Sequence, residues 1–490
     1  MPCTTILVGK DATYDGSTMT ARNEDASAGD FNPKKFIVVL PKDQPRLYKS
    51  VSSGAEIPLP DNPVRYTAVP DALPKKGIWG EAGVNAYNVG MTATETITSN
   101  ARVLGADPLV PGGIGEEDIL TIVLPYIKSA REGVLRLGSL LEEYGTYEMN
   151  GIGFQDVREI WWLETIGGHH WIARRVPDQA YVIVPNQQGI DFFDLEDAFG
   201  EQKDHLCSDD LLSFIGEHHL DCSIHGESYD LSKEKAFEVR PAFGSRDDSD
   251  HSYNTPRAWA MGRYLNAKSF HWDGPEADYG PESDDIPWAL IPDHKLTVAD
   301  IKYVLSNHFQ GTSFDPYCRH GDSSQQGRYR PIGINRTNFV SLIQLRPYRP
   351  EGIMALQWMA MGSNVFNAFV PFYANVTSTP DYFSLTGREV TTKNFYWANR
   401  LIAALADAHF AECSSAIERY QNKVHAKGME LLESFDKAAN TGQADRLQSF
   451  LEQCNKQFSD MVEMETQDLL DRVLYQASMN MKNSFARSDA

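Results

Sequence analysis

The stretch CTTILVGKDATYDGSTMTARNED, residues 3–25, decides the fold of the amino-terminal part of this chain. An apolar run, TTILVG, is followed by the turn-forming residues YDGS at 14–17 and then by a second run, a pattern typical of a β-hairpin. Arg22 and Asp25 follow Cys3 by 19 and 22 residues, so the second strand can bring them back beside the thiol. The sequence therefore predicts a sheet that begins with this hairpin.

Cys3 follows only Met1 and Pro2. A cysteine with a free α-amino group carries both a nucleophile and a base, because an α-amino group titrates near pH ~8 and a thiol near pH ~8.5. A cation at Arg22 would favour the thiolate, and a carboxylate at Asp25 would orient the amino group. The alternative that the residues leave open is a small buried cysteine at the start of an edge strand.

Short apolar runs between turn residues predict further strands. These runs are 35–40, 89–97, 158–167, 169–176, 180–186, 339–347, 352–362 and 366–376. The segment 116–144 instead has apolar residues at helical spacing and is interrupted at Pro125, which predicts two helices or one kinked helix. From about Val390 onward there is almost no glycine and no proline, which indicates several packed helices.

These patterns together predict an α+β fold. Residues 1–385 form the expected core, with a mixed insertion at 203–290 whose acidic loop, 271–288, is rich in glycine and proline. Residues 386–490 are expected to be a helical extension packed on that core. Strands in two sets, with helices before, between and after them, are compatible with two stacked antiparallel sheets flanked by helices. Composition alone does not separate this arrangement from other mixed folds.

The composition excludes several classes of protein. Of the 490 residues, 42% are hydrophobic and 23% are charged, as in globular proteins rather than disordered or fibrous ones. The formal net charge of −22 argues against binding to nucleic acid or to anionic membranes. Neither a secretion signal nor a run of ~18 apolar residues is visible, so we expect a cytoplasmic protein. The six cysteines are sparse and form no C-x-x-C pair, which fits a reducing compartment.

Other motifs for catalysis or binding are weaker. His169 and His170 are adjacent, so in a strand they point to opposite faces, and we favour a structural hydrogen-bonding role over metal binding. The glycines at 112–115 lack the lysine of a phosphate-binding loop, and the acids at 116–118 suit the first turn of a helix. No G-x-S-x-G elbow is present, and the second candidate thiol, Cys318, lacks accompanying motifs.

Several longer motifs, taken together, resemble those of one family. They are CTTILVGK at 3–10, YDGSTMTARNED at 14–25, NVGMTATET at 88–96, GGxGEED at 112–118, WxLETxGxHxW at 161–171, VPNQ at 184–187 and YNxxR at 253–257. In this order they resemble the N-terminal-nucleophile cysteine dipeptidases of bacteria, which are relatives of the secernins and, more distantly, of bile-salt hydrolases and penicillin V acylases. The motifs extend over at least the first half of the chain.

The resemblance implies a four-layer αββα N-terminal-nucleophile hydrolase sandwich with an added helical carboxy-terminal region. Cys3 would be the nucleophile and its own amine the general base, once the leader of residues 1–2 is removed. Arg22 and Asp25 match the arginine and aspartate that flank the thiol in the family. Cleavage of the bond before Cys3 by its own thiol is our hypothesis for removal of the leader.

Two further site residues are implied by shorter motifs. Asn186 stands where the acylase relatives place an oxyanion-stabilising asparagine, and Arg257 stands where they place a second active-site arginine. Those relatives carry another asparagine where this chain has Ala93 or Thr94, so the second oxyanion donor is not assigned.

The function implied by the resemblance is hydrolysis of dipeptides through a thioester on Cys3, with no cofactor and no metal. The expected partners are small dipeptide substrates rather than nucleic acid or membrane, and a homo-oligomer is expected because family members are often multimeric. Two alternatives stay open. One is an acylase acting on another amide, such as a bile-salt conjugate or penicillin V. The other is a non-enzymatic, secernin-like interaction protein that uses its helical tail as a docking surface.

Overall fold

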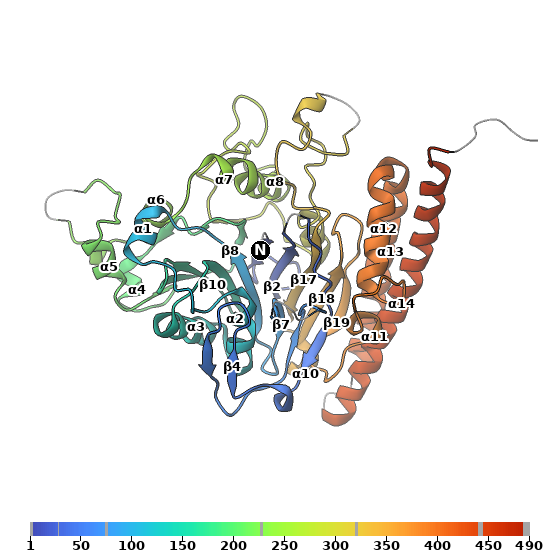
Figure 1. Ribbon diagram of the computed structural model, residues 1–490, viewed down its shortest axis with the longest axis horizontal. Coiled ribbons are helices and arrows are strands. Elements are labelled where there is room, and N and C mark those ends of the chain that lie inside the picture. Colours follow the sequence, from blue (N-terminus) through green and yellow to red (C-terminus); the bar gives the residue numbers. More distant parts are fainter. Residues whose placement is uncertain are drawn as a thin grey trace, which may run out of the picture.

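The described residues form an α+β fold around two large antiparallel sheets (Figure 1). The computed structural model describes residues 3–27, 29–73, 77–225, 229–318, 322–439 and 444–483, apart from the side chains of 93–95, 444 and 445. The first sheet has the order β16 (Ala289–Leu290), β12 (Tyr181–Val184), β1 (Cys3–Val8), β2 (Thr18–Asp25), β17 (Thr337–Leu345), β18 (Ala355–Met361), β19 (Val370–Tyr373). The second has the order β14 (His205–Cys207), β11 (His170–Arg175), β10 (Ile160–Ile166), β9 (Asn150–Gln155), β8 (Gly90–Thr96), β7 (Ala82–Val84). Shorter pairs are β3 (Ile37–Val39) with β6 (Tyr66–Ala68), β4 (Leu47–Lys49) with β5 (Glu56–Pro58), and β13 (Phe192–Phe193) with β15 (Phe237–Glu238).

The predicted hairpin is confirmed and lies at the centre of the first sheet. β1 pairs with β2 in a register that sets Cys3 opposite Glu24 and Thr5 opposite Arg22. The turn between them contains Gly16 at φ +78°, a left-handed conformation that glycine adopts at little cost. β1 also pairs with β12, so Cys3 begins an internal strand and not an edge strand.

The two large sheets pack face to face. Leu7 of the first sheet shares an apolar cluster with Trp162 of the second. Gln155 on β9 bridges the sheets, because its Nε2 donates to the carbonyl of Thr18 at 2.7 Å and its Oε1 accepts from Thr20 Oγ1 at 2.5 Å. The second sheet thus covers one face of β1 and β2, and every residue of these two strands is buried.

The sequence analysis missed β9, whose sequence is NGIGFQ. Glycine weakens a strand pattern because it contributes no side chain to pack. Here the neighbours require it: a Cβ on Gly151 would lie 2.2 Å from the ring of Trp162, and one on Gly153 would lie 2.7 Å from Thr92 Oγ1. Packing of the large indole ring therefore explains a strand that its own composition does not reveal.

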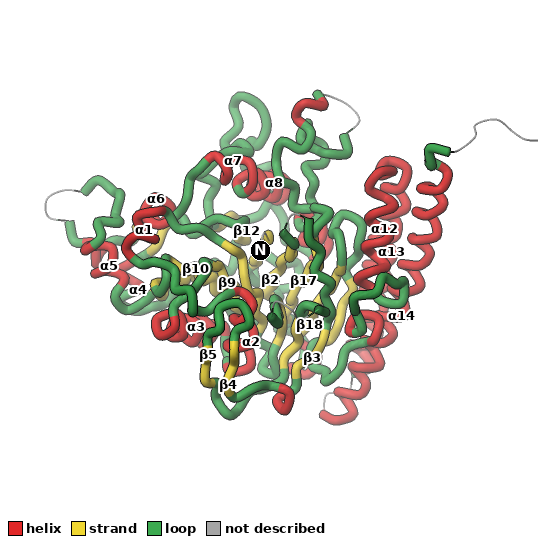
Figure 2. Tube along the Cα trace, viewed as in Figure 1, coloured by secondary structure: helices red, strands yellow, loops and turns green. Residues whose placement is uncertain are grey.

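Helices lie on the outer sides of the sheets (Figures 1 and 2). The helices beside the second sheet include α2 (Glu116–Val123) and α3 (Ala130–Tyr144), which share an apolar cluster with β9 and β10. They are separated by a 3₁₀ turn at Leu124–Tyr126, so the two helices predicted for 116–144 are confirmed. The short helices are α1 (Ala101–Ala106), α4 (Leu195–Ala198), α5 (Leu211–Glu217), α6 (Val239–Phe243), α7 (Asp248–Tyr253), α8 (Thr255–Leu265), α9 (Val298–Val304), α10 (Glu351–Met354) and α11 (Asp381–Ser384).

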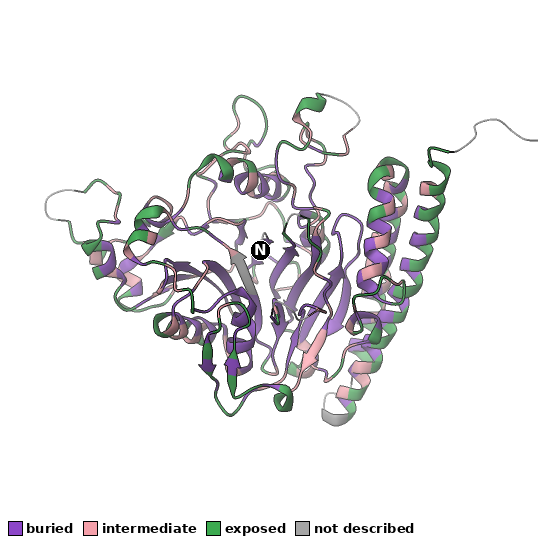
Figure 3. Cartoon of the chain, viewed as in Figure 1, coloured by how far each residue is buried: buried purple, intermediate pink, exposed green. Residues whose placement is uncertain are grey.

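The carboxy-terminal part of the described chain is helical. It comprises α12 (Phe395–Ala406), α13 (Phe410–Ala438) and α14 (Ala444–Met479), which pack beside β18 and β19 of the first sheet (Figure 1). Their inner faces are buried and their outer faces exposed, as Figure 3 shows. Within the described ranges, no helix combines the length and the apolar character that crossing a membrane requires.

Candidate active site

The Cys3 thiol contacts a buried guanidinium. Nη2 of Arg22 donates a hydrogen bond to Sγ of Cys3 at 2.6 Å, and neither residue is exposed. The β1–β2 register explains the contact. Cys3 lies opposite Glu24, and side chains two residues apart on one strand share a face, so Arg22 lies on the face that carries the thiol. The hairpin thus brings the predicted cation to the predicted nucleophile.

Arg22 belongs to a buried cluster of opposite charges. Its Nη1 donates to Glu81 Oε2 at 2.5 Å, and its Nη2 lies 3.6 Å from Glu116 Oε1. Burial by itself would lower the pKa of Arg22, but its interactions with Cys3, Glu81 and Glu116 outweigh this effect and raise the pKa. The guanidinium is therefore held in its charged form, which is the form that favours a thiolate.

A second buried cation extends this cluster. Nζ of Lys34 lies 2.6 Å from Glu24 Oε2, 2.8 Å from Asp71 Oδ1 and 3.8 Å from Glu81 Oε1. Burial would lower the pKa of Lys34, but Asp71 and Glu24 raise it overall.

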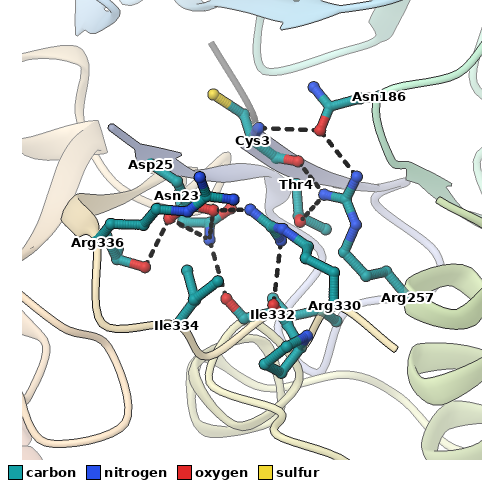
Figure 4. Close-up of polar contacts among 12 residues, drawn as sticks. Cys3, Thr4, Asn23, Asp25, Asn186, Arg257, Arg330, Ile332, Ile334 and Arg336 are labelled. Atoms are coloured by element: carbon teal, nitrogen blue, oxygen red, sulfur yellow. Dashed lines mark hydrogen bonds and ion pairs between the residues drawn. The ribbon is translucent and has the colours of Figure 1, made fainter. Parts of the chain in front are cut away.

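Asp25 belongs to a different network. Asn23 and Asp25 alternate with Arg22 along β2, so they lie on the opposite face of the strand. The Asp25 carboxylate accepts hydrogen bonds from Arg330 and, at 2.6 Å, from Thr337 Oγ1, as well as from Asn23 Nδ2 at 3.2 Å. Figure 4 shows Asp25 grouped with Asn23 and Arg330. Arg22 and Asp25, the two charged residues expected beside the thiol, therefore lie on opposite faces of β2, near the same end of the hairpin.

Asn186 and Arg257 meet at the backbone of Cys3 (Figure 4). The Cys3 N–H donates to Asn186 Oδ1 at 3.2 Å, and Arg257 Nη2 donates to the same oxygen at 2.8 Å. Arg257 Nη1 also donates to the Cys3 carbonyl and, at 2.7 Å, to Thr4 Oγ1. Both residues that the shorter motifs singled out thus lie within hydrogen-bonding distance of Cys3, although they are separated from it by 183 and 254 positions.

The start of α8 and the ends of β12 and β8 hold Arg257 and Asn186 in place. Arg257 lies in the first turn of α8, where its Nε donates to the carbonyl of Tyr253 and its Nη2 to Asn254 Oδ1, both at 2.8 Å. Asn186 follows β12, and its Nδ2 donates to the carbonyl of Thr96, the last residue of β8, at 3.0 Å. The β8–β9 register shifts between residues 93 and 95, a bulge beside the predicted position of the second oxyanion donor. The side chains of 93–95 lie outside the described part of the chain.

Comparison with known proteins identifies the family. The family model described as peptidase family C69 matches residues 2–423. The chain belongs to peptidase family C69. Similar proteins include the dipeptidase of Bifidobacterium longum (strain NCC 2705), 54% identical over 539 aligned residues that cover all of both chains, and probable dipeptidase A of Streptococcus pyogenes serotype M3 (strain SSI-1), 54% identical over 489 residues that also cover all of both. Dipeptidase A of Lactobacillus helveticus is 42% identical over 480 residues and 96% of each chain. The resemblance inferred from the motifs is confirmed.

Several residues at the C69 site were not singled out from the sequence. Lys34, Glu81 and Arg330 lie outside the named helices and strands and are distant from Cys3 in the sequence, and no motif marked them. Glu116 was assigned to the first turn of a helix, which is correct for α2, but it also lies beside Arg22. The available signal was the presence of three charged residues, Arg22, Glu24 and Asp25, within four positions of a predicted strand, since a charged residue inside a buried strand requires a partner.

The other candidate residues have structural contacts in this C69 protein. Nδ1 of His169 lies 2.8 Å from Asp107 Oδ1, and Nδ1 of His170 lies 2.7 Å from Oδ2 of the same carboxylate. The favoured hydrogen-bonding role of the two histidines is thus what the structure shows. Cys318 is partly buried, and the histidine two residues after it lies outside the described residues. No group of three potential metal ligands occurs within the described ranges.

Proposed function

We propose that this C69 peptidase is a cysteine dipeptidase in which Cys3, once it is the first residue of the chain, attacks the peptide bond of the substrate. The observation that supports this most directly is the 2.6 Å contact between Arg22 Nη2 and Cys3 Sγ, because a buried cation beside a thiol favours the nucleophilic thiolate. The names of the similar proteins, dipeptidase and probable dipeptidase A, support the substrate class.

The proposed cycle uses the two functional groups of Cys3. The α-amine takes the thiol proton, and the thiolate attacks the carbonyl carbon of the dipeptide. Asn186 and a second, unassigned donor stabilise the tetrahedral oxyanion. The protonated amine then gives its proton to the leaving amino acid, while the other amino acid stays bound as a thioester. Water, with the same amine as base, hydrolyses the thioester, so the cycle requires neither a metal nor an organic cofactor.

The roles proposed for the surrounding residues follow their contacts. Arg22 stabilises the thiolate from the face of β2 that carries the sulfur. Arg257 binds the Cys3 carbonyl and Asn186, so it fixes the backbone of the nucleophile relative to the oxyanion donor. Asp25 lies at the same end of the hairpin, held by Arg330, and would orient the free amine of Cys3.

The leader must be removed before Cys3 has a basic amine. In the proposed step the thiol adds to the carbonyl carbon of Pro2, the Pro2–Cys3 C–N bond breaks, and the nitrogen takes the thiol proton. Water then cleaves the resulting thioester and releases Met1 and Pro2 with a carboxylate end. An active preparation should therefore lack both residues by intact mass spectrometry. Activity in a protein that still carries Pro2 would exclude the free-amine mechanism.

The remaining parts of the proposal concern the architecture. The facing sheets and the helices outside them support a four-layer αββα N-terminal-nucleophile sandwich for the catalytic core, residues 1–385 without the leader and with the insertion at 203–290. Residues 386–490 would be a helical extension. We also propose a homo-oligomer, which light scattering after size-exclusion chromatography tests, and a cytoplasmic location, which the six free cysteines favour.

The experiment that tests the function is a substrate panel for the wild-type protein. Dipeptides with different side chains are compared with a glycine-conjugated bile salt and with penicillin V, and the primary amine that hydrolysis of each amide releases is measured. Hydrolysis of the dipeptides supports the proposal. Turnover only of the bile salt or of penicillin V would assign the protein to the acylase alternative.

Substitution of the nucleophile separates an enzyme from an interaction protein. Cys3→Ala should abolish dipeptide hydrolysis, whereas Cys318→Ala, which removes the other candidate thiol, should leave the rate unchanged. Unchanged hydrolysis in a clean Cys3→Ala preparation would place the activity elsewhere. No hydrolysis by any preparation with a free Cys3 amine would favour the non-enzymatic alternative.

A further inference from the structure

A cavity of about 520 Å³ lies away from Cys3, between α9 and α13, and none of the proposed catalytic residues lines it. Its volume falls within the range of small-molecule sites, roughly 300–1,000 Å³. Val365, Phe369, Phe410 and Ile417 supply an apolar wall. Polar residues line the rest of the cavity, among them Lys302 of α9 and Ser414, Gln421 and Asn422 of α13.

Lys302 is a cation without a carboxylate partner. Its Nζ donates to Ser306 Oγ at 2.6 Å and to the carbonyl of Asn364 at 2.7 Å, and an ammonium group has a third N–H. Among the described residues no carboxylate forms an ion pair with it, and burial without a compensating charge lowers the pKa of Lys302 to about 7.

The other titratable groups of the cavity do not supply that counter-charge. Asp315 is bound to His308 Nδ1 at 2.9 Å and to the N–H of Tyr317. Glu418 is exposed on α13 and forms no ion pair with Lys302. Burial lowers the pKa of His425, which favours its neutral form. The cavity therefore combines a lysine that, among the described residues, forms no ion pair and an apolar surface formed by Val365, Phe369, Phe410 and Ile417.

We propose that this cavity is a second binding site, and that its ligand is a small molecule with a carboxylate and an apolar body. The carboxylate would accept from Lys302 and supply the missing negative charge, while the body packs on Phe369 and Phe410. Amino acids with apolar side chains and simple organic acids share this chemistry. The proposal does not depend on the chemistry at Cys3.

The test is isothermal titration calorimetry of the full-length protein with three probes that share a phenyl body. They are 3-phenylpropionate, 3-phenylpropan-1-ol and L-phenylalanine. We expect 3-phenylpropionate to bind at least about tenfold more tightly than the alcohol, because only the carboxylate can pair with Lys302. Tighter binding of phenylalanine than of 3-phenylpropionate identifies an amino acid as the ligand class, and weaker binding identifies a plain organic acid.

Variants locate the binding. Lys302→Met, which keeps an unbranched side chain of similar size and removes the ammonium group, should weaken 3-phenylpropionate binding at least about tenfold. The matched control Lys268→Met changes an exposed lysine that does not line the cavity and should bind as the wild type does. No binding of 3-phenylpropionate by the wild type, or equal binding by Lys302→Met, would overturn the proposal. If Lys302→Met does not fold, a crystal of the wild type soaked with 3-phenylpropionate decides: a carboxylate away from Lys302 Nζ also overturns it.

Discussion

Arg22 is shared between Cys3 and Glu81: one nitrogen of its guanidinium donates to the thiol at 2.6 Å and the other to the carboxylate at 2.5 Å. All three side chains are completely buried. A buried guanidinium needs negative partners, and here one of them is the proposed nucleophile. The cation therefore has a structural role and a chemical one, and a substitution should affect both.

We expect Arg22→Met to destabilise the fold by about 3–5 kcal/mol, because it leaves the carboxylates of Glu81 and Glu116 buried without their cation. Dipeptide hydrolysis should also fall, because the thiolate loses its partner. Urea denaturation followed by circular dichroism measures the first effect, and initial rates at a temperature where the variant is folded measure the second.

The control for this prediction is Arg472→Met. Arg472 pairs with Asp468 at 3.1 Å on the exposed face of α14, and an exposed pair contributes at most about 1 kcal/mol. Equal losses of stability in Arg22→Met and Arg472→Met would contradict the prediction, because Arg22 would then not stabilise the fold through the buried charge cluster.

The contact between Arg22 and Cys3 was predictable because both residues belong to one hairpin. A local turn signal and strand alternation fix their register, and neither depends on the rest of the chain. The helical tail was predictable for a similar reason, since its pattern is long and free of proline. Asn186 and Arg257 were found only through the family resemblance.

Glu81, Lys34 and β9 show where sequence reasoning stops. Glu81 reaches Arg22, and Lys34 reaches Glu24 and Glu81, from separate segments, and a charged residue in a loop gives no sign that it will be buried. β9 was missed because its glycines weaken the strand pattern, and Gly151 is required only because the ring of Trp162, on the next strand, leaves no room for a Cβ. In each case the decisive partner is a tertiary contact that no local pattern encodes.

The close packing of Gly151 in β9 against Trp162 leads to a prediction about stability. Gly151→Ala should destabilise the protein by about 1–3 kcal/mol, because the added methyl would lie 2.2 Å from Trp162 and the indole must move. Gly105→Ala is the matched control: its Cβ would meet no atom within 4 Å, and it lies in α1, where alanine is preferred by up to about 1 kcal/mol. Thermal denaturation of both variants checks the prediction, and a neutral Gly151→Ala would contradict it.

The contacts of Asn186 predict a selective effect on catalysis. Asn186→Ala should lower kcat for dipeptides about 10²–10³-fold if the amide stabilises the oxyanion, with a smaller change in KM. The neighbouring Gln187→Ala should retain most of the activity, since Gln187 Nε2 donates to the carbonyl of Ser245 and not to Cys3. A change confined to KM in Asn186→Ala would assign Asn186 to substrate binding instead.

The contacts of Asp107 with His169 and His170 predict that this carboxylate makes a pH-dependent contribution to the free energy of unfolding. Burial would raise the pKa of Asp107, but hydrogen bonds from His170 and His169 outweigh it and hold this pKa below its ordinary value. Because the folded state binds the proton less readily than the unfolded state, the contribution is fully present above the unfolded pKa of about 3.9. It is lost as the pH falls through the lower folded pKa.

Asp107→Asn should therefore destabilise the protein by about 1–3 kcal/mol at pH 7, where the wild-type carboxylate is charged. The difference in unfolding free energy from the wild type should shrink as the pH falls below about 4, because the wild type then loses the same charge. Urea denaturation along a series of falling pH measures this difference, with the exposed Asp61→Asn as a control that should show little effect. A difference that stays constant down to the most acidic condition would mean that Asp107 acts through packing and not through its charge.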